Sequence, residues 1–318
     1  MLQYLIILLD DTATSYCHYN STGEQRRLIE PNDLKEGIIF AMKHNLTVQF
    51  LYPAYDIPDE YKSMIETVDH IKMMPIEVQD SAKADVLIFN SPVFFTTENI
   101  YKHKDKILVL RSSKHELSLL SEVIKSSAEN ISRLNIVVTD TDTFNDGDFD
   151  TYGQWLESLC SIINAKYSKG IVPQINLLTD RILLDSMNNC NAGILNITLA
   201  PNGKFYVCPA FYAENKEDSI GNLKDGICIK NSHLYKLEYA PLCRNCDAYH
   251  CRRCVWLNRK TTLEVNTPSH EQCFTAHLER NAAKKLCDDL KTIGYFADKE
   301  IPSIDYLDPF DVRKKFNL

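Results

Sequence analysis

The chain has 318 residues, of which 44% are hydrophobic and 25% are charged, a balance typical of a globular protein with about two domains. No apolar run approaches the ~18 residues that a membrane span needs, so we expect no membrane insertion. The formal net charge of −8 provides no basic surplus to neutralise phosphates. It therefore argues against nucleic acid as the main partner.

The chain starts with the apolar segment MLQYLIILLDD. No basic region precedes the apolar residues, and no small-residue cleavage site follows them, so the segment lacks the features of a signal peptide. We expect it to form a first buried strand, and we expect a cytoplasmic protein.

Short apolar runs in the N-terminal half predict strands at residues 5–9, 46–51, 85–89, 106–110, 134–139 and 174–178. Each run is unbroken rather than alternating, which is typical of parallel strands covered on both faces. Helical patterns lie between the runs, and capping-box starts are predicted at Asp33 with Glu36, Ser113 with Glu116 and Thr151 with Gln154. This alternation predicts a parallel sheet, either an open partial barrel or a doubly wound sheet.

The loop after the first strand carries polar residues where α/β folds place their chemistry. It holds Asp10, Asp11, Cys17 and His18, which we take as candidate catalytic residues. One cysteine and one histidine cannot complete a four-ligand metal site by themselves. The alternative is that these side chains are ordinary polar loop residues.

An acidic stretch at residues 139–157 has partial similarity to a calcium-binding loop. Asp146, Asp148, Asp150 and Glu157 fall at positions one, three, five and twelve of an EF-hand pattern. Thr151 occupies the position of the glycine that makes the sharp turn. The pattern therefore favours a solvated loop ahead of a capped helix over a calcium site.

The cysteines carry the strongest signal. There are eleven, and nine of them lie between Cys190 and Cys287. In a chain without a secretory signal, clustered cysteines indicate metal ligands rather than disulfides. Residues 194–207 predict a β-hairpin with Gly203 in its turn, and the ends of a hairpin would bring Cys190 and Cys208 together.

A denser group follows, in which Cys243, Cys246, Cys251 and Cys254 form two C-x2-C pairs and Cys273 lies further along. Zinc sites usually separate such pairs by roughly 12–20 residues, whereas here only four residues intervene. That spacing favours a larger iron–sulfur cluster, and seven thiolates exceed the needs of one centre. Two clusters, one of them short of a protein ligand, are therefore expected. A pair of structural zinc sites is the alternative.

The remaining cysteines have simpler interpretations. Cys160 and Cys287 fall on predicted helices, the second of them capped by Ser269, and are expected to be buried apolar side chains. Cys228 is a spare cysteine that is available to the under-ligated cluster. Arg244, Arg252 and Arg253 surround the dense group, where they would raise a cluster potential or balance thiolate charge.

The spacing Cys190-x12-Gly203-x4-Cys208, the sequence Ile220-Gly221-Asn222-Leu223 and the dense group resemble the SPASM domain. That domain follows radical-SAM barrels in enzymes that modify ribosomal peptides and carries auxiliary [4Fe–4S] clusters. The resemblance implies a partial parallel (β/α)6 barrel of radical-SAM type in residues 1–188. It further implies a small α+β cysteine-rich SPASM domain in residues 189–292 and a C-terminal tail in residues 293–318.

The opening LLDDTATSYCHY and the overall layout resemble the CXXX-repeat peptide maturases more narrowly. These are bacterial proteins associated with precursor peptides that contain repeated Cys-x-x-x units. Carried over to this sequence, the family pattern implies two ligand sets. Cys190, Cys208 and Cys254 would hold a first [4Fe–4S] cluster, and Cys243, Cys246, Cys251 and Cys273 would hold a second. The family usually spaces its central run as C-x2-C-x5-C-x3-C with two glycines before the last cysteine, where this chain has shorter gaps and Arg252-Arg253.

The larger departure from the family lies in the first loop. Radical-SAM enzymes bind their catalytic cluster with C-x3-C-x2-C after the first strand, and that spacing occurs nowhere in this sequence. We therefore predict no SAM site and no reductive SAM cleavage by this chain alone. The resemblance implies an iron–sulfur maturation factor for a Cys-rich precursor peptide that acts with a partner radical-SAM enzyme. The alternative is a zinc-stabilised scaffold that binds the peptide or a partner without a redox role.

Overall fold

The computed structural model describes residues 2–20 and 25–301, and the chain divides into two compact units. The first unit comprises Met1–Asn90, Lys106–Val109 and Asn191–Lys236, and the second comprises Ser91–Asp105, Leu110–Cys190 and Leu237–Leu318. Each unit therefore combines segments that are far apart in the sequence. The division expected after residue 188 stays a prediction, and residues 302–318 of the expected tail lie outside the described residues.

A mostly parallel sheet forms the first unit. Its strands are β1 (Tyr4–Leu8), β2 (Thr47–Leu51), β3 (His70–Pro75), β4 (Val86–Phe89), β8 (Asn196–Leu199), β9 (Lys204–Tyr206), β10 (Gly221–Asn222) and β11 (Gly226–Ile227). They lie in the order β11-β10-β9-β8-β1-β2-β3-β4. The neighbours from β8 to β4 are parallel, whereas β9, β10 and β11 add antiparallel pairs. The helices are α1 (Pro31–Lys43), α2 (Asp59–Ile65) and α7 (Pro209–Glu214).

The first apolar segment forms the predicted buried strand. Leu5 and Ile7 of β1 are fully buried, and β1 is paired on both edges, with β2 and with β8. β3 was missed by the sequence analysis. It pairs with β2 and β4, although its sequence HIKMMP contains one β-branched residue and ends in proline, which are weak strand signals.

The predicted hairpin is confirmed by β8 and β9, in which Leu199 pairs with Phe205. Gly203 lies in the turn with φ +74°, and a Cβ there would come within 2.7 Å of the Asp33 carboxylate. Glycine is therefore required both by the left-handed backbone and by the space available.

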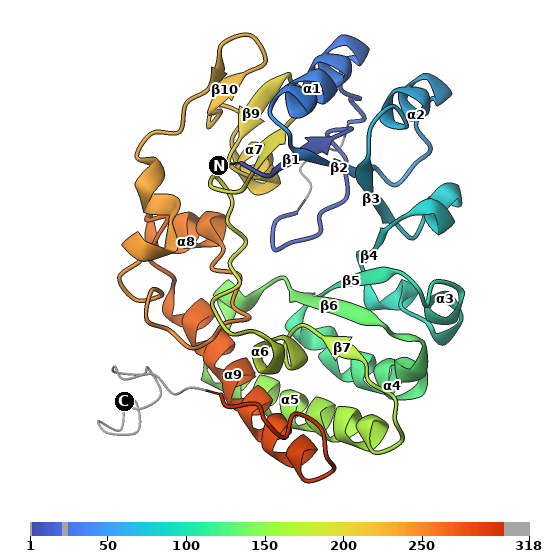
Figure 1. The fold of residues 1–318 in the computed structure, drawn as a ribbon, viewed down its shortest axis with the longest axis vertical. Helices are drawn as coiled ribbons and strands as arrows, with labels where there is room; N and C mark the ends of the chain where they lie inside the picture. The colour runs from blue at the N-terminus through green and yellow to red at the C-terminus, as the bar shows by residue number, and fades with distance from the viewer. Residues whose placement is uncertain (1, 21–24, 302–318) are drawn as a thin grey trace. The chain divides into compact units, whose positions relative to one another are not determined.

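The second unit is a group of helices beside short strands. Its strands are β6 (Arg133–Val138), β7 (Gln174–Ile175) and the part of β5 (Ile107–Ser112) that starts at Leu110. Its helices are α3 (Thr97–Lys102), α4 (Leu117–Ser127), α5 (Asp146–Tyr167), α6 (Thr179–Leu183), α8 (Val255–Thr262) and α9 (His270–Lys291). α9 packs along α5 and against α6 (Figure 1). The Phe149 and Phe274 rings lie 4.4 Å apart at this contact.

The predicted helix starts are confirmed in one case and wrong in two. Ser113 and Glu116 form the expected capping box. α1 begins at Pro31, ahead of Asp33, because proline is well suited to the first turn, where its missing N–H costs no hydrogen bond. α5 begins at Asp146, so Thr151 lies inside the helix and its hydroxyl donates to the Gly147 carbonyl.

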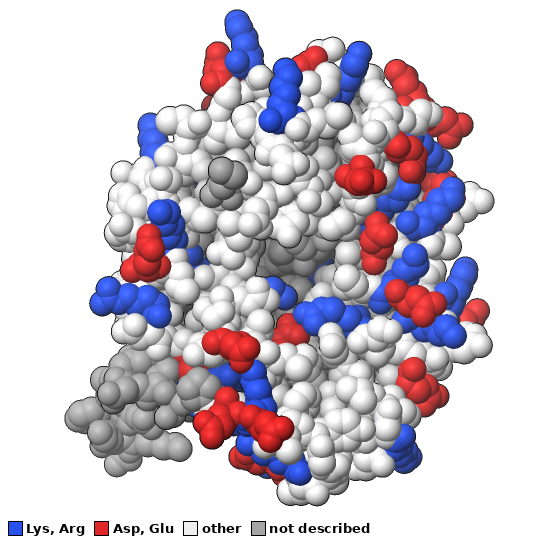
Figure 2. Space-filling model, in the orientation of Figure 1, with Lys and Arg blue, Asp and Glu red and all other residues white. Residues whose placement is uncertain are grey.

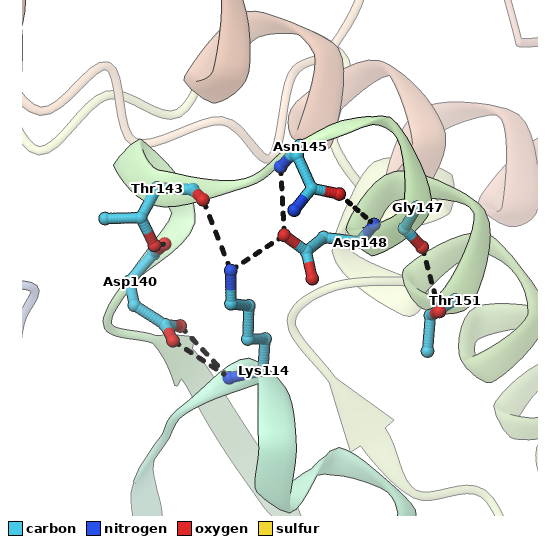
Figure 3. A network of polar contacts seen from close by, with 7 residues as sticks. All are labelled: Lys114, Asp140, Thr143, Asn145, Gly147, Asp148 and Thr151. Atoms are coloured by element: carbon cyan, nitrogen blue, oxygen red, sulfur yellow. Dashed lines mark hydrogen bonds and ion pairs between the residues drawn. The ribbon is translucent and has the colours of Figure 1, made fainter.

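The acidic stretch is part of α5 from Asp146 onward rather than a loop. Asn145 caps the helix through the Asp148 N–H at 3.1 Å, and the Asp148 carboxylate accepts from the Asn145 N–H at 2.9 Å (Figure 3). The same carboxylate accepts from Lys114 Nζ at 2.7 Å. These hydrogen bonds, the Lys114 contact first, lower the pKa of Asp148. Asp148 is thus used by the helix start, and the calcium interpretation needs a loop over residues that are helical here.

Replacing Asn145 with alanine is expected to lower the free energy of unfolding by about 1 kcal/mol, because the cap bond is lost. Urea denaturation followed by circular dichroism measures the change. Asp150 is exposed and makes no part of the cap, so Asp150→Asn is the control, expected to change stability by less than about 0.5 kcal/mol. A rise in the denaturation midpoint on adding calcium would restore the calcium interpretation.

The surface carries mixed charge. On the face drawn in Figure 2, acidic and basic side chains are interspersed, in agreement with the lack of a basic surplus in the sequence. Within residues 2–20 and 25–301, no helix combines the length and the hydropathy that crossing a membrane requires.

Candidate metal centre

The predicted metal ligands fall in both units. Cys208 is the N-cap residue of α7 in the first unit, and the others all belong to the second unit. Cys160 and Cys287 are buried, as expected for apolar side chains, whereas Cys228 is exposed. In the part of the chain that the structure describes, no three histidine, cysteine or acidic side chains already stand at the distances of a single metal-ion site. Whether these residues suit a metal or cluster therefore depends on the surroundings of the thiols.

Four of the predicted ligands line one small cavity in the second unit. They are Cys243, Cys246, Cys251 and Cys273, with apolar walls from Met187, Leu242, Pro268 and Ala276. Tight turns hold the first three, since the Cys246 N–H donates to Cys243 O at 3.1 Å and the Cys251 N–H donates to Ala248 O at 2.9 Å. Cys273 lies in the first turn of α9, which the Ser269 side chain caps. The structure thus brings together the whole set assigned by resemblance to the second cluster.

Burial disfavours the thiolate form of Cys243 and Cys251. It raises the pKa of Cys243 to about 11. Cys251 is raised well above the ordinary value, first by burial and then by its neighbours Cys243, Cys246 and Cys273. Thiolates are the form that metals bind, so loading this cavity releases protons and needs a cation to stabilise the charge. The donor set fits an iron–sulfur cluster, and it also suits the softer metal ions.

Cys190 and Cys254 form a second thiol group in the same unit. The Cys190 N–H donates to Arg252 O at 2.9 Å, which holds Cys190 beside the Cys251–Cys254 segment. Burial, followed by the Cys190 charge, raises the pKa of Cys254 to about 12. Cys254 is also the N-cap of α8, where its sulfur accepts from the Leu257 N–H at 3.5 Å. A helix N-terminus favours the thiolate once a metal is present.

The four residues between Cys246 and Cys251 fasten this segment to α9. Asp247, which is 1% exposed, accepts from Arg280 Nη1 at 2.9 Å and from Lys284 Nζ at 2.8 Å. Burial raises the pKa of Asp247, but the bonds from Lys284 and Arg280 outweigh it and the net pKa is lowered. The carboxylate is therefore charged, and it ties the turn to the helix that carries Cys273.

A second buried contact lies at the other end of the same gap. His250 Nε2 is 2.9 Å from Glu279 Oε2, and the Tyr152 hydroxyl donates to Glu279 Oε1 at 2.7 Å. Burial, together with the Glu279 charge, raises the pKa of Tyr152 well above its ordinary value. The short gap between the cysteine pairs is thus anchored to α9 and, through Tyr152, to α5.

His277 is a residue of the cavity that the sequence analysis missed. It is 1% exposed, lines the cavity with the four cysteines, and its Nε2 lies 3.5 Å from Cys246 Sγ. It follows Cys273 by four residues on α9, and residues with that spacing share a helix face. This spacing was the available signal, and it places a nitrogen donor beside the thiols.

The candidate catalytic residues of the first loop have structural partners. Asp10 is fully buried and accepts from the Thr12 N–H and the Tyr55 hydroxyl, each at 2.8 Å. Asp11 accepts from the Tyr212 hydroxyl and pairs with Lys216 at 3.1 Å. These contacts fix the loop after β1. They give the two carboxylates a role in folding.

Cys17 and His18, the other two candidates in this loop, are half-buried. The Cys17 N–H donates to Ser15 Oγ at 3.3 Å, and the Ser15 hydroxyl donates to the Cys17 carbonyl at the same distance. The described contacts therefore involve the Cys17 backbone. A catalytic role for either side chain stays a prediction.

The α/β fold of this chain, with its parallel sheet, is similar to the folds of two solved proteins, anSMEcpe and SuiB. The anaerobic sulfatase-maturating enzyme anSMEcpe, solved with bound AdoMet, matches with a TM-score of 0.63 and 11% identity over 92% of this chain and 96% of that chain. Its complex with AdoMet and a peptide matches with a TM-score of 0.59 and 12% identity over 91% and 99% of the two chains.

SuiB from Streptococcus suis, bound to its precursor peptide SuiA, matches with a TM-score of 0.50 and 10% identity over 86% of this chain and 76% of that chain. No protein-family model and no curated protein sequence matches the chain. At these identities the likeness shows the fold. The expected α/β fold class with a parallel sheet is thereby confirmed.

Proposed function

We propose that this protein is an iron–sulfur maturation factor for a ribosomally made Cys-x-x-x-repeat peptide in the bacterial cytoplasm. The observation that carries the proposal is the cavity lined by Cys243, Cys246, Cys251 and Cys273. The likeness to peptide-modifying enzymes, two of them solved with bound peptides, supports a peptide as substrate.

Two [4Fe–4S] clusters are proposed, with the second held by the four cysteines of the cavity. For the first cluster we propose Cys190, Cys208 and Cys254, the set that the resemblance implies. A cluster with three protein thiolates has one iron open to an outside ligand. When bound, the clusters would supply electron transfer and a coordination site for a substrate thiolate, and the protein would hold and orient the peptide.

Radical chemistry is assigned in this proposal to a partner radical-SAM enzyme. The sequence lacks C-x3-C-x2-C, and the loop after β1 holds Cys17 as its single cysteine. Asp10 and Asp11 of that loop are engaged with Tyr55 and Tyr212. The proposed role of this chain is to present the peptide and to relay electrons.

Metal analysis of anaerobically purified protein tests the cluster proposal. Two clusters predict about eight irons and eight acid-labile sulfides per chain. About four of each would restrict the protein to one cluster. Zinc without sulfide would overturn the redox role, and the chain would then be a metal-stabilised binding scaffold.

The Cys254→Ser variant tests the proposal that an iron of the first cluster binds a thiolate of the peptide. Loss of the first cluster is expected to weaken binding of a Cys-x-x-x peptide, measured by fluorescence anisotropy, since the substrate thiolate loses its iron. The matched control is the same peptide with its cysteines replaced by serine. A variant that keeps both full clusters and normal peptide affinity would contradict the proposal.

Replacing His277 with leucine is expected to weaken iron retention at the second cluster by about 10–100-fold, because a side chain in polar contact with a ligand sulfur holds that ligand in place. Competition with an iron chelator measures the loss. His270 lies on the same helix with 59% of its side chain exposed, so His270→Leu is the control and is expected to retain iron normally. Equal retention in both variants would remove His277 from the site.

A further inference from the structure

Arg253 is placed in an unusual way for an arginine. It lies between the predicted ligands Cys251 and Cys254, is 2% exposed, and has φ +48°. A left-handed backbone is unfavourable for a long side chain, and burying a guanidinium removes its hydration. Its neighbour Arg252 is exposed. A buried positive charge at position 253 is unfavourable for folding unless neighbouring groups stabilise it.

The surroundings of Arg253 include thiols from each of the two predicted ligand sets. Arg253 lines the cavity of Cys243 and Cys251, and the hydrogen bond from the Cys190 N–H to the Arg252 carbonyl holds Cys190, a member of the other set, beside the same turn. Burial lowers the pKa of Arg253, while Cys243, Cys251 and Cys190 act in the opposite direction. One buried cation thus interacts with cysteines assigned to both clusters.

We propose that Arg253 is a positioning residue shared by the two cluster sites, and that its fixed positive charge raises the reduction potential of both clusters. The inference rests on the proposed function, since it requires the clusters to be present. Reduction adds one electron to a centre that is already surrounded by thiolates. A buried cation beside both centres stabilises the reduced form more than the oxidised form, because the interaction grows with the negative charge.

An EPR-monitored redox titration of the anaerobically loaded protein, with dithionite as the reductant, tests the inference. In Arg253→Gln the reduced-to-oxidised ratio of each cluster at a fixed solution potential is expected to fall by about tenfold. Arg253→Lys keeps the charge and is expected to titrate close to the wild type. Arg252→Gln removes a charge from the adjacent exposed position and is the matched control, expected to leave both potentials unchanged.

The possible outcomes separate this inference from the proposed function. Zinc without sulfide in the wild type overturns both. Full iron with superimposable titrations of the wild type and Arg253→Gln overturns the role of Arg253 alone, and a shift confined to one cluster overturns its shared position. If the glutamine variant fails to fold, the same redox titration is made on Arg253→Gly, because glycine accepts a positive φ without strain.

Discussion

Replacing Cys273 with alanine is expected to remove about half of the iron and sulfide from the anaerobically purified protein, leaving about four of each per chain. Cys273 lines the cavity from the first turn of α9, and the other thiols of that set come from the turns around Cys243–Cys251. Without it, the proposed second cluster loses the one ligand that joins the turns to the helix. Colorimetric iron and sulfide assays measure the result, and EPR identifies the cluster that remains.

The matched control lies on the same helix. Cys287 is fully buried in α9 and does not line the cavity, so Cys287→Ala makes the same chemical change away from the proposed ligands. It is expected to reduce stability through a small internal void while keeping all the iron. If Cys273→Ala retained the wild-type iron content, the proposed ligand set would be wrong.

Replacing Asp247 with asparagine is expected to lower the free energy of unfolding of the protein by about 3–5 kcal/mol. The carboxylate is buried with Arg280 and Lys284 within hydrogen-bond distance, and Arg181, which is also buried, has Nη2 at 3.9 Å. Asparagine keeps the shape but leaves these cations without their counter-charge, and two of them, Arg181 and Arg280, are buried away from water. Denaturant unfolding followed by circular dichroism measures the change.

The control for Asp247 is an exposed ion pair in the same unit. Asp185 is 89% exposed and pairs with Lys299, so Asp185→Asn is expected to change stability by less than about 1 kcal/mol. A loss of similar size in the two variants would contradict the role of Asp247 as the anchor between the cysteine turn and α9.

Apolar runs predicted most of the parallel strands, because a strand that is buried on both faces has an uninterrupted run of apolar residues. β1, β2, β4, β5 and β6 lie within two residues of their predicted ends, whereas β7 is shorter than expected. β3 was missed because its burial comes from its place between β2 and β4. Helix starts were less predictable. Pro31 is a start signal of another kind, and the capping box of Asn145 has Asp148 where the sequence pattern expects glutamate or glutamine.

Cysteine spacing grouped Cys243, Cys246 and Cys251 correctly, since the short turns between them keep the three thiols close in any fold. The place of Cys273 in the same cavity was predicted only through the family resemblance. The partners of those turns could not be predicted in the same way. Asp247 and His250 meet Arg280 and Glu279 through the packing of α9, and that contact depends on the rotation of a helix about its axis. Arg253 is similar, since its burial follows from a positive φ that the sequence does not reveal.

The central position of β1 has a consequence for dissecting the protein. β1 pairs with β2 on one edge and with β8, a strand from much later in the chain, on the other. A fragment ending at residue 188 would expose that second edge along a strand whose residues Leu5–Leu8 are otherwise buried. Unpaired apolar edges recruit strands from other molecules. Such a truncation would therefore aggregate, and the chain has to be studied whole.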